Sequence, residues 1–459
     1  MGFPIGVLFC RVDGLCNTAC WVMADGPQPA NPIETGARPS GIQYGNMDWI
    51  YLDNNATTRP APEVLQAVQE THERFWANPS SVHRFGQMVR HRIDQARAQV
   101  AAMVNCQDRQ LVFTSGGTES NNLALRGVLD PTRRRPNQAP SRSVLITAPT
   151  EHAAVREPAQ DLAQRGVLVV ELPVDRYGQI QPDALAAALN QHATGPCLPL
   201  VSIQWANNET GIIQPIEALV AVCGAHRPKG GPRVLVHVDA TQAVGKIPVD
   251  VGRVPVDLLT LSAHKFHGPK GIGALFMRDG VHVQPQTLGG PQERQKRGGT
   301  EHTAGIVGLG VAADLARAFL ADAAHVQQLT ALRDRFEQGI LQRLPQTVIH
   351  AKGPSDSASG PAPNRLWNTA SLGFEHLSAE AIIISLSEQG LCASAGAACS
   401  SGSLEPSPVL LAMGVPEPVA HGSIRFSLSR YTTDHEIDQA IPMVIGVIEK
   451  LAKTMPLAI

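Results

Sequence analysis

The sequence predicts an α/β protein in which a large domain with a mostly parallel, seven-stranded sheet precedes a smaller α+β domain. Two observations predict the sheet. Short β-branched runs alternate with amphipathic helical patterns over about 200 residues, which is typical of strand–helix–strand units. Several of these runs are apolar almost throughout, as expected of strands that are covered on both faces. The regular alternation of strand and helix patterns ends after about residue 304, which predicts the second domain.

The runs expected to form the strands of the large domain cover residues 111–114, 144–147, 167–172, 200–204, 234–238, 258–262 and 273–277. Apolar residues three or four apart predict helices over residues 62–75, 86–104, 119–128, 152–164 and 182–190. A long helical stretch from about residue 304 to 344 leads into the second unit. That unit has strand candidates near 367–374 and 424–428 and a closing helix from residue 434.

These patterns divide the chain into four parts. We expect a large domain over residues 63–320 and a small C-terminal domain over residues 321–459. Residues 49–62 are expected to join the small domain. Residues 1–48 have no sustained period and contain clusters of Pro, Gly and Asn, so they are expected to form a flexible N-terminal extension.

Composition excludes several classes of protein. The 459 residues include 38 basic and 40 acidic ones, and this balance gives no electrostatic basis for binding nucleic acid or a membrane surface. No run approaches 18 continuous apolar residues, so we expect no membrane-spanning helix. Eight cysteines are too few for a disulfide scaffold, and no clear secretion signal precedes them, so a cytoplasmic location is expected. The spacing of Cys10, Cys16 and Cys20 does not predict a metal site.

An amine and a carboxylate end two neighbouring strand candidates. Lys265 follows the run 258–262, and a Lys at the end of a buried strand is costly because desolvation disfavours its charge, unless it serves as an imine-forming amine. Asp239 lies 26 residues earlier (265 − 239), which leaves room for one helical crossover and one strand. The pair suits pyridoxal phosphate (PLP), which needs an amine for its aldehyde and an acid for its ring nitrogen. The alternatives are a Lys that reaches solvent and an Asp that caps a helix.

Two further polar segments follow strand candidates. Residues 113–122 pass from a strand through Gly116-Gly117 into a helix start, which makes a cradle of N–H groups and hydroxyls for an anion. A plain helix cap is the alternative. His152 follows the run 144–147, where an imidazole can stack on an aromatic cofactor or move a proton. A capping or core His is the alternative there.

The small domain contributes a thiol and a guanidinium. Cys399 lies among small residues and glycines, so residues of about 393–405 are expected to form a mobile loop that carries a reactive thiol. Arg425 alternates with Ile424 and Phe426 on a strand candidate, which suits a rigid, bidentate grip on a carboxylate. An ion pair within the small domain is the alternative for Arg425.

Taken together, these segments resemble the cysteine desulfurases of the NifS/IscS type, within the class V (fold type I) PLP-dependent aminotransferase family. The resemblance runs in order from about residue 49 to 455 and rests on residues 51–58, 78–83, 114–122, 150–152, 207–211, 237–246, 262–273, 297–300, 399–407 and 423–430. Two features depart from the family pattern. Ala395 and Ala397 stand where Ser is frequent, and the residues before 48 have no counterpart.

The resemblance implies PLP as the cofactor and a role for each matched residue. The implied catalytic residues are Lys265, which binds the cofactor as an imine and moves protons, His152, which stacks on the ring, and Cys399, which accepts sulfur. The implied cofactor-binding residues are Asp239 at the ring nitrogen, Gln242 and Asn208 at the phenolic oxygen, and Gly117, Thr118, Ser262, His264 and the partner subunit's Thr300 at the phosphate. The implied substrate-binding residues are Arg425, at the carboxylate, and Asn55.

The implied activity is the removal of sulfur from L-cysteine, which gives L-alanine and a persulfide on Cys399. The sulfur would pass to an acceptor such as an iron–sulfur scaffold protein, and the longer segment after the thiol resembles the subgroup that feeds such scaffolds. The resemblance implies a homodimer, and it does not imply a bound metal ion. Two alternatives stay open: a related PLP enzyme, such as a selenocysteine lyase or another aminotransferase, and a non-enzymatic sulfur carrier or metal-binding scaffold.

Overall fold

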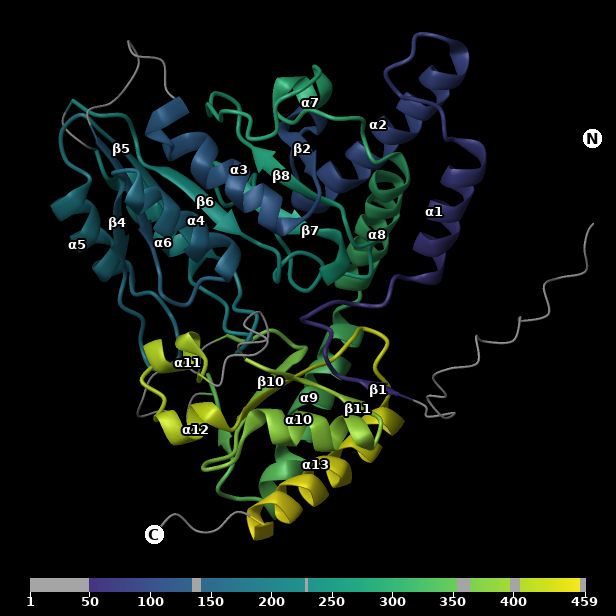
Figure 1. Ribbon diagram of the computed structural model, residues 1–459, viewed down its shortest axis with the longest axis vertical. Helices are drawn as coiled ribbons and strands as arrows, with labels where there is room; N and C mark the ends of the chain where they lie inside the picture. The colour runs from purple at the N-terminus through teal and green to yellow at the C-terminus, as the bar shows by residue number, and fades with distance from the viewer. Residues whose placement is uncertain (1–48, 134–141, 228–229, 353–363, 397–404, 455–459) are drawn as a thin grey trace, which may run out of the picture. The chain divides into compact units, whose positions relative to one another are not determined.

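The computed structural model describes residues 49–133, 142–227, 230–352, 364–396 and 405–454 (Figure 1). The predicted extension over residues 1–48 lies outside the described residues, and so does Cys399, with most of its predicted loop.

A seven-stranded sheet forms the centre of residues 111–277, which confirms the predicted fold class. Its strands follow the order β2-β8-β7-β6-β5-β3-β4 (Figure 1). Strand β8 is antiparallel to both of its neighbours, and the other neighbouring pairs are parallel. The strands are β2 (Leu111–Thr114), β3 (Arg142–Thr147), β4 (Leu168–Glu171), β5 (Cys197–Gln204), β6 (Leu235–Asp239), β7 (Leu258–Ser262) and β8 (Gly273–Met277).

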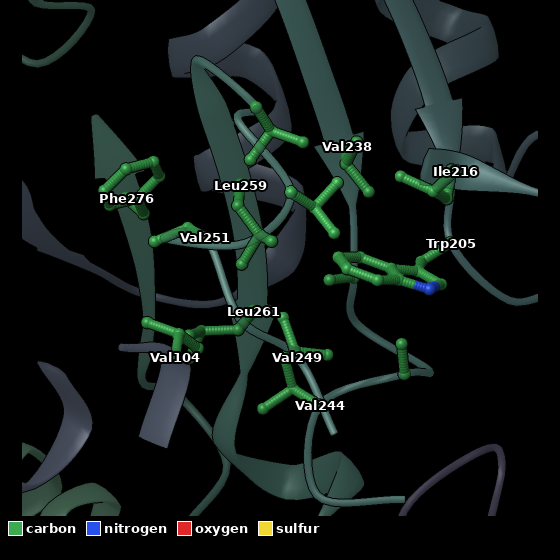
Figure 2. Packing of buried hydrophobic residues seen from close by; sticks show 14 of the residues in the cluster. Val104, Trp205, Ile216, Val238, Val244, Val249, Val251, Leu259, Leu261 and Phe276 are labelled. Carbon is green, nitrogen blue, oxygen red and sulfur yellow. The ribbon is translucent and has the colours of Figure 1, made fainter. Parts of the chain in front are cut away.

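Apolar side chains cover both faces of this sheet. On β7, Leu259 and Leu261 belong to one apolar cluster and Leu258 belongs to another, because successive residues of a strand point to opposite faces. Figure 2 shows part of the first cluster, where Leu259 lies beside Phe276, its partner on the next strand. The covering helices are α1 (Pro62–Arg74), α2 (Arg84–Val104), α5 (Pro182–His192), α6 (Ile216–Ala225) and α8 (Thr303–Ala321) in the first cluster, and α3 (Gly117–Leu129) and α4 (Ala153–Gln164) in the second.

Helix α8 is long and apolar enough to cross a membrane, with a mean hydropathy of 1.6. In this protein 61% of that stretch is buried, and the helix packs against α1 and α2 (Figure 1). Burial in the core therefore accounts for its apolar composition. The long helical stretch that the sequence predicts is broken at Asp322, whose side chain accepts a hydrogen bond from the N–H of His325 at the start of α9 (Ala323–Arg343).

Two small sheets are formed by C-terminal strands together with β1 from the start of the described chain. One is antiparallel, with the order β12-β13-β10-β9, and the other joins β1 to β11 in parallel. Ile50 of β1 belongs to the same apolar cluster as Phe336 of α9 and Phe426 of β13. The elements are β1 (Ile50–Tyr51), β9 (Val348–Ile349), β10 (Thr369–Gly373), α10 (Ala379–Glu388), β11 (Leu391–Cys392), β12 (Ser394–Ala395), α11 (Pro408–Ala412), α12 (Glu417–His421), β13 (Ser423–Ser427) and α13 (Asp434–Thr454). The short helix α7 (Gln292–Gln295) lies beside the large sheet instead, where the carboxylate of Glu293 accepts a hydrogen bond from the N–H of Phe113 in β2.

The connection from β6 to β7 corrects one expectation. Residues 240–257 form successive turns and contain no helix, so the predicted helical crossover is wrong. Asp239 starts the first turn by accepting a hydrogen bond from the N–H of Thr241 at 2.9 Å, and Asp250 accepts from the N–H of Gly252 at 2.7 Å in a later one. The two strands are nevertheless parallel neighbours, so Asp239 and the turn that holds Lys265 reach the same edge of the sheet.

Candidate active site

A cavity of about 310 Å³ lies at the carboxyl edge of the seven-stranded sheet, where ligands bind in α/β folds. Most of the predicted site residues line it together: Asn55, Gly117, Thr118, His152, Asn208, Asp239, Gln242, Ser262, His264, Lys265 and Arg425. Thr300 is exposed and does not line this cavity. Cys399 lies outside the described residues, although Gly396, three residues before it, reaches the cavity wall.

Lys265 turns its amine into the protein. It lies in a short 3-10 turn directly after β7, and its Nζ donates to the carbonyl oxygens of Asn55 at 2.7 Å and Ala56 at 2.8 Å. A Lys that simply reached solvent would not have this arrangement. The amine instead lies in the cavity wall, at a position where an aldehyde can meet it.

Asp239 is 5% exposed and serves two functions in the structure. One carboxylate oxygen accepts the turn-forming N–H of Thr241, and the other accepts from Nδ2 of Asn121 at 2.7 Å. Asp239 therefore caps a turn and not the helix of the alternative, and it does so together with its cavity position. Because Asn121 belongs to α3, the helix after the glycine turn and the strand β6 hold this carboxylate jointly.

The start of α3 forms an anion cradle. Gly116 has a φ of 151°, in the region that favours glycine, and it precedes the first turn of the helix. A Cβ added to Gly117 would lie 3.0 Å from Oγ1 of Thr241, so glycine keeps this approach open. The hydroxyl of Ser262 lines the same part of the cavity. Helix N–H groups and hydroxyls at one place suit a phosphate.

His264 stands beside this cradle as a neutral imidazole. Burial lowers its pKa to about 4, and the nearby charges of Lys265 and Lys270 act in the same direction. One ring nitrogen lies 3.2 Å from the hydroxyl of Thr57. A neutral ring can share a hydrogen bond with an anion without an added proton.

His152 lies in the cavity wall, directly before the first residue of α4. Its Nδ1 accepts from the N–H of Ala154 at 3.0 Å, so the capping alternative holds here too. Glu151, just before it, is fully buried, and its carboxylate accepts from the N–H of Gln204 at 2.6 Å. Burial raises the pKa of Glu151 well above its usual value, which favours the protonated form of this acid behind the cavity.

Arg425 is 2% exposed on β13 and is held from two sides. Its Nη2 lies 2.8 Å from Oδ1 of Asp53, and its Nη1 donates to the carbonyl of Asn208 at 3.1 Å. The ion-pair alternative is therefore present, yet Nε is buried without a hydrogen-bond partner. A guanidinium fixed in this way has a donor left for a bound carboxylate.

Several residues at the site were not singled out from the sequence. They are Asn121, Thr241, Lys246 and Glu209. All four lie inside segments that match the family pattern, and this position was the one sign in the sequence that they belong to the site. Glu209 is buried, which raises its pKa, and it accepts a hydrogen bond from Oγ of Ser407 at 2.5 Å.

The polar groups of this cavity fit PLP. Two of them, Oδ1 of Asn121 and Oγ1 of Thr241, are buried without a hydrogen-bond partner although their residues line the cavity. Such atoms are destabilising unless a ligand or water satisfies them. The α3 cradle matches a phosphate, Asp239 matches a ring nitrogen, and Lys265 matches an aldehyde.

His237 provides a prediction on pH. Its ring lies between Oγ of Ser202 at 2.8 Å and Oγ1 of Thr260 at 3.1 Å, and burial lowers its pKa from 6.5 to about 4. Between these two pH values, His237 binds a proton in the unfolded chain but not in the folded protein. Stability is therefore lost as the pH falls below 6.5, by about 2 kcal/mol at a pH of about 5.

Urea unfolding at a pH of about 7 and of about 5 measures this loss. The variant His237→Asn keeps a hydrogen-bonding side chain without a titrating ring, so its loss between the two pH values should be smaller by about 2 kcal/mol. An equal loss in both proteins would show that His237 does not titrate in this interval.

Comparison with known proteins agrees with this site. Residues 50–440 match the family described as aminotransferase class-V. "Cysteine desulfurase 2" of Trichormus variabilis is 45% identical over 410 residues, which cover 89% of this chain and 96% of that protein. "Cysteine desulfurase NifS" of Azotobacter vinelandii is 40% identical over 408 residues, which cover 89% and 94%.

Solved structures show the same likeness. A structure described as a NifS-like protein superposes with a TM-score of 0.76 at 33% identity, covering 88% of this chain and 100% of that one. A structure of SspA in complex with cysteine has a TM-score of 0.67 at 32% identity and covers 83% and 99%. With the cavity and its polar groups, these matches show that the chain belongs to the aminotransferase class-V family, whose cofactor is PLP.

Proposed function

We propose that this protein is a cysteine desulfurase that uses PLP to take sulfur from L-cysteine and release L-alanine. The observation that carries the proposal is the single cavity in which the Lys265 amine, the Asp239 carboxylate and the His152 imidazole meet. Relatives that are 40–45% identical over 89% of the chain bear the name cysteine desulfurase, which supports this activity. When bound, PLP supplies an aldehyde for the amine of the substrate and a ring that withdraws electrons from its Cα.

The chain's own residues would perform the remaining steps. Arg425 binds the substrate carboxylate, and Nζ of Lys265 removes the Cα proton. The thiolate of Cys399 then forms a bond to the substrate sulfur while the bond between that sulfur and the substrate Cβ breaks. The electron pair stays with Cβ, which takes up a proton and becomes the methyl group of L-alanine. Cys399 keeps the sulfur as a persulfide.

The test of this function is an assay of both products. Purified protein that is incubated with L-cysteine and a thiol reductant should release alanine and sulfide in equal amounts, and it should show visible absorption near roughly 400 nm. A non-enzymatic sulfur carrier or metal-binding scaffold would lack that absorption. A colourless protein that forms no alanine after reconstitution with PLP would contradict the proposal.

Replacement of Asp239 by Asn should lower kcat for L-cysteine about 10²-fold. Asn keeps a side chain of the same shape, but it lacks the charge that holds a ring nitrogen protonated. Steady-state kinetics with saturating PLP measures the effect, and Asp438→Asn, at an exposed position of α13, is the control. A kcat within twofold of the wild-type value would contradict the role of Asp239.

The partners follow from the same activity. We propose that the persulfide passes to an acceptor such as an iron–sulfur scaffold protein and that the protein acts as a homodimer in the cytoplasm. The exposed position of Thr300 supports a contact across a subunit boundary, and Cys106, Cys197, Cys223 and Cys392 are free thiols, which suits a reducing compartment. Light scattering that finds only monomer would contradict the dimer.

A further inference from the structure

Lys246 is a buried lysine behind the cavity. It follows β6 in the turns over residues 240–257 and is 4% exposed, and its carbonyl accepts from Nε1 of Trp367 at 2.9 Å. Within the described ranges no carboxylate forms an ion pair with it. A buried amine without an acid is destabilising unless its N–H groups are used.

The amine of Lys246 donates to two side-chain amides. Its Nζ lies 3.0 Å from Oδ1 of Asn55, and it also donates to Oε1 of Gln242. Both of these amides line the cavity, whereas Lys246 itself does not. Since each amide oxygen faces Lys246, each NH₂ group must point away from it.

The orientation of these amides has a consequence inside the cavity. Nε2 of Gln242 donates to the carbonyl oxygen of Asn55 at 2.9 Å, and Nζ of Lys265 donates to the same oxygen at 2.7 Å. The NH₂ group of Gln242 and the amine of Lys265 therefore converge on one atom. In PLP the aldehyde carbon and the phenolic oxygen are attached to adjacent ring atoms, so a donor beside the Lys265 nitrogen is placed to meet that oxygen.

The charges around Lys246 favour its neutral form. Burial lowers the pKa of its amine well below the usual value, and the neighbouring cations Lys265 and Arg425 lower it further. A neutral amine has two N–H groups, and the two amide oxygens accept both of them. Lys246 thus satisfies its hydrogen bonds without a carboxylate.

We propose that Lys246 is a positioning residue that holds the amide oxygen of Gln242 and so turns the NH₂ group of Gln242 toward the phenolic oxygen of PLP. This inference rests on the proposed PLP-dependent function. A donor to the phenolic oxygen stabilises it most when the neighbouring Lys265 nitrogen carries no proton, because the oxygen then holds more negative charge. Loss of the donor should therefore make that nitrogen easier to protonate.

The experiment is a spectroscopic pH titration of the PLP-loaded protein near roughly 400 nm, where protonation at Lys265 changes the absorption. We expect Lys246→Met to raise the midpoint by about one pH unit. The control Lys450→Met, at an exposed position of α13, should leave the midpoint unchanged. If Lys246→Met does not fold, Lys246→Gln replaces it and should still raise the midpoint, by about 0.3 unit or more.

A second comparison tests whether Lys246 acts through Gln242. In the Gln242→Leu protein the amide is gone, so adding Lys246→Met should cause no further shift. A shift of equal size in that background, or an unchanged midpoint in the single variant that folds, would overturn the inference. A wild-type protein that shows no visible absorption with PLP would instead overturn the proposed function itself.

Discussion

Replacement of Lys265 by Ala is expected to lower turnover of L-cysteine by about 10⁴-fold and to abolish the covalent PLP label that borohydride reduction leaves on the protein. Nζ of Lys265 is the amine that the structure holds in the cavity wall, against the carbonyl oxygens of Asn55 and Ala56. Alanine removes both the group that binds the aldehyde and the group that moves the Cα proton. The phosphate cradle of α3 remains, so PLP should still bind without a covalent bond.

The control for this prediction comes from other lysines near the site. Lys246 is buried next to the cavity, and Lys270 lies at the edge of the α3 cradle. Borohydride reduction of the wild-type protein followed by peptide mapping should place the PLP label on Lys265 alone. A label on Lys246 or Lys270, or an Ala variant that still carries covalent PLP after borohydride reduction and denaturation, would contradict the assignment.

The second large effect is expected at Cys399. The variant Cys399→Ala should lose turnover of L-cysteine by about 10³-fold or more while it keeps the absorption of bound PLP. In the proposed mechanism the bond between the substrate Cβ and its sulfur breaks as the thiolate of Cys399 accepts that sulfur, and the variant lacks this acceptor. Absorption spectra and alanine release, measured on the same samples, separate loss of chemistry from loss of cofactor.

Cys392 provides the matched control. It lies half-buried in β11, seven residues before Cys399, and burial raises the pKa of its thiol. The variant Cys392→Ala should keep full turnover. If Cys399→Ala also kept turnover of L-cysteine, sulfur transfer to this thiol would be excluded. If Cys399→Ala turned over selenocysteine but not L-cysteine, the result would fit both a desulfurase and a selenocysteine lyase. L-cysteine is therefore the decisive substrate.

The central sheet could be predicted from the sequence because its strands are covered on both faces. Runs such as 258–262 and 273–277 are apolar almost throughout and end at turn residues, and the structure has strands at the same bounds. Helix α6 was not predicted, because it is apolar on nearly all sides and short, so it has no amphipathic period. The turns over residues 240–257 were not predicted, because hydrogen bonds from backbone N–H groups to the side chains of Asp239 and Asp250 stabilise them. Such bonds leave no period in the apolar residues.

The site was predictable where a residue's position along a strand decides its role. Lys265 and Asp239 end parallel neighbours, so the order of the sheet brings them together. Lys246 and Glu209 were not singled out, because each depends on contacts with residues far away in the chain. Asn55 precedes the sheet in the chain and Ser407 follows it, so these contacts form only in the folded protein and no local pattern encodes them.

The most direct test of the central claim is the intact mass of the protein after incubation with L-cysteine, without reductant. The proposed function predicts a gain equal to one or more sulfur atoms, located on the peptide that contains Cys399, removed by a thiol reductant and absent from the Lys265→Ala protein. An unchanged mass of PLP-loaded protein that nevertheless releases alanine, or sulfur located on another cysteine, would contradict it.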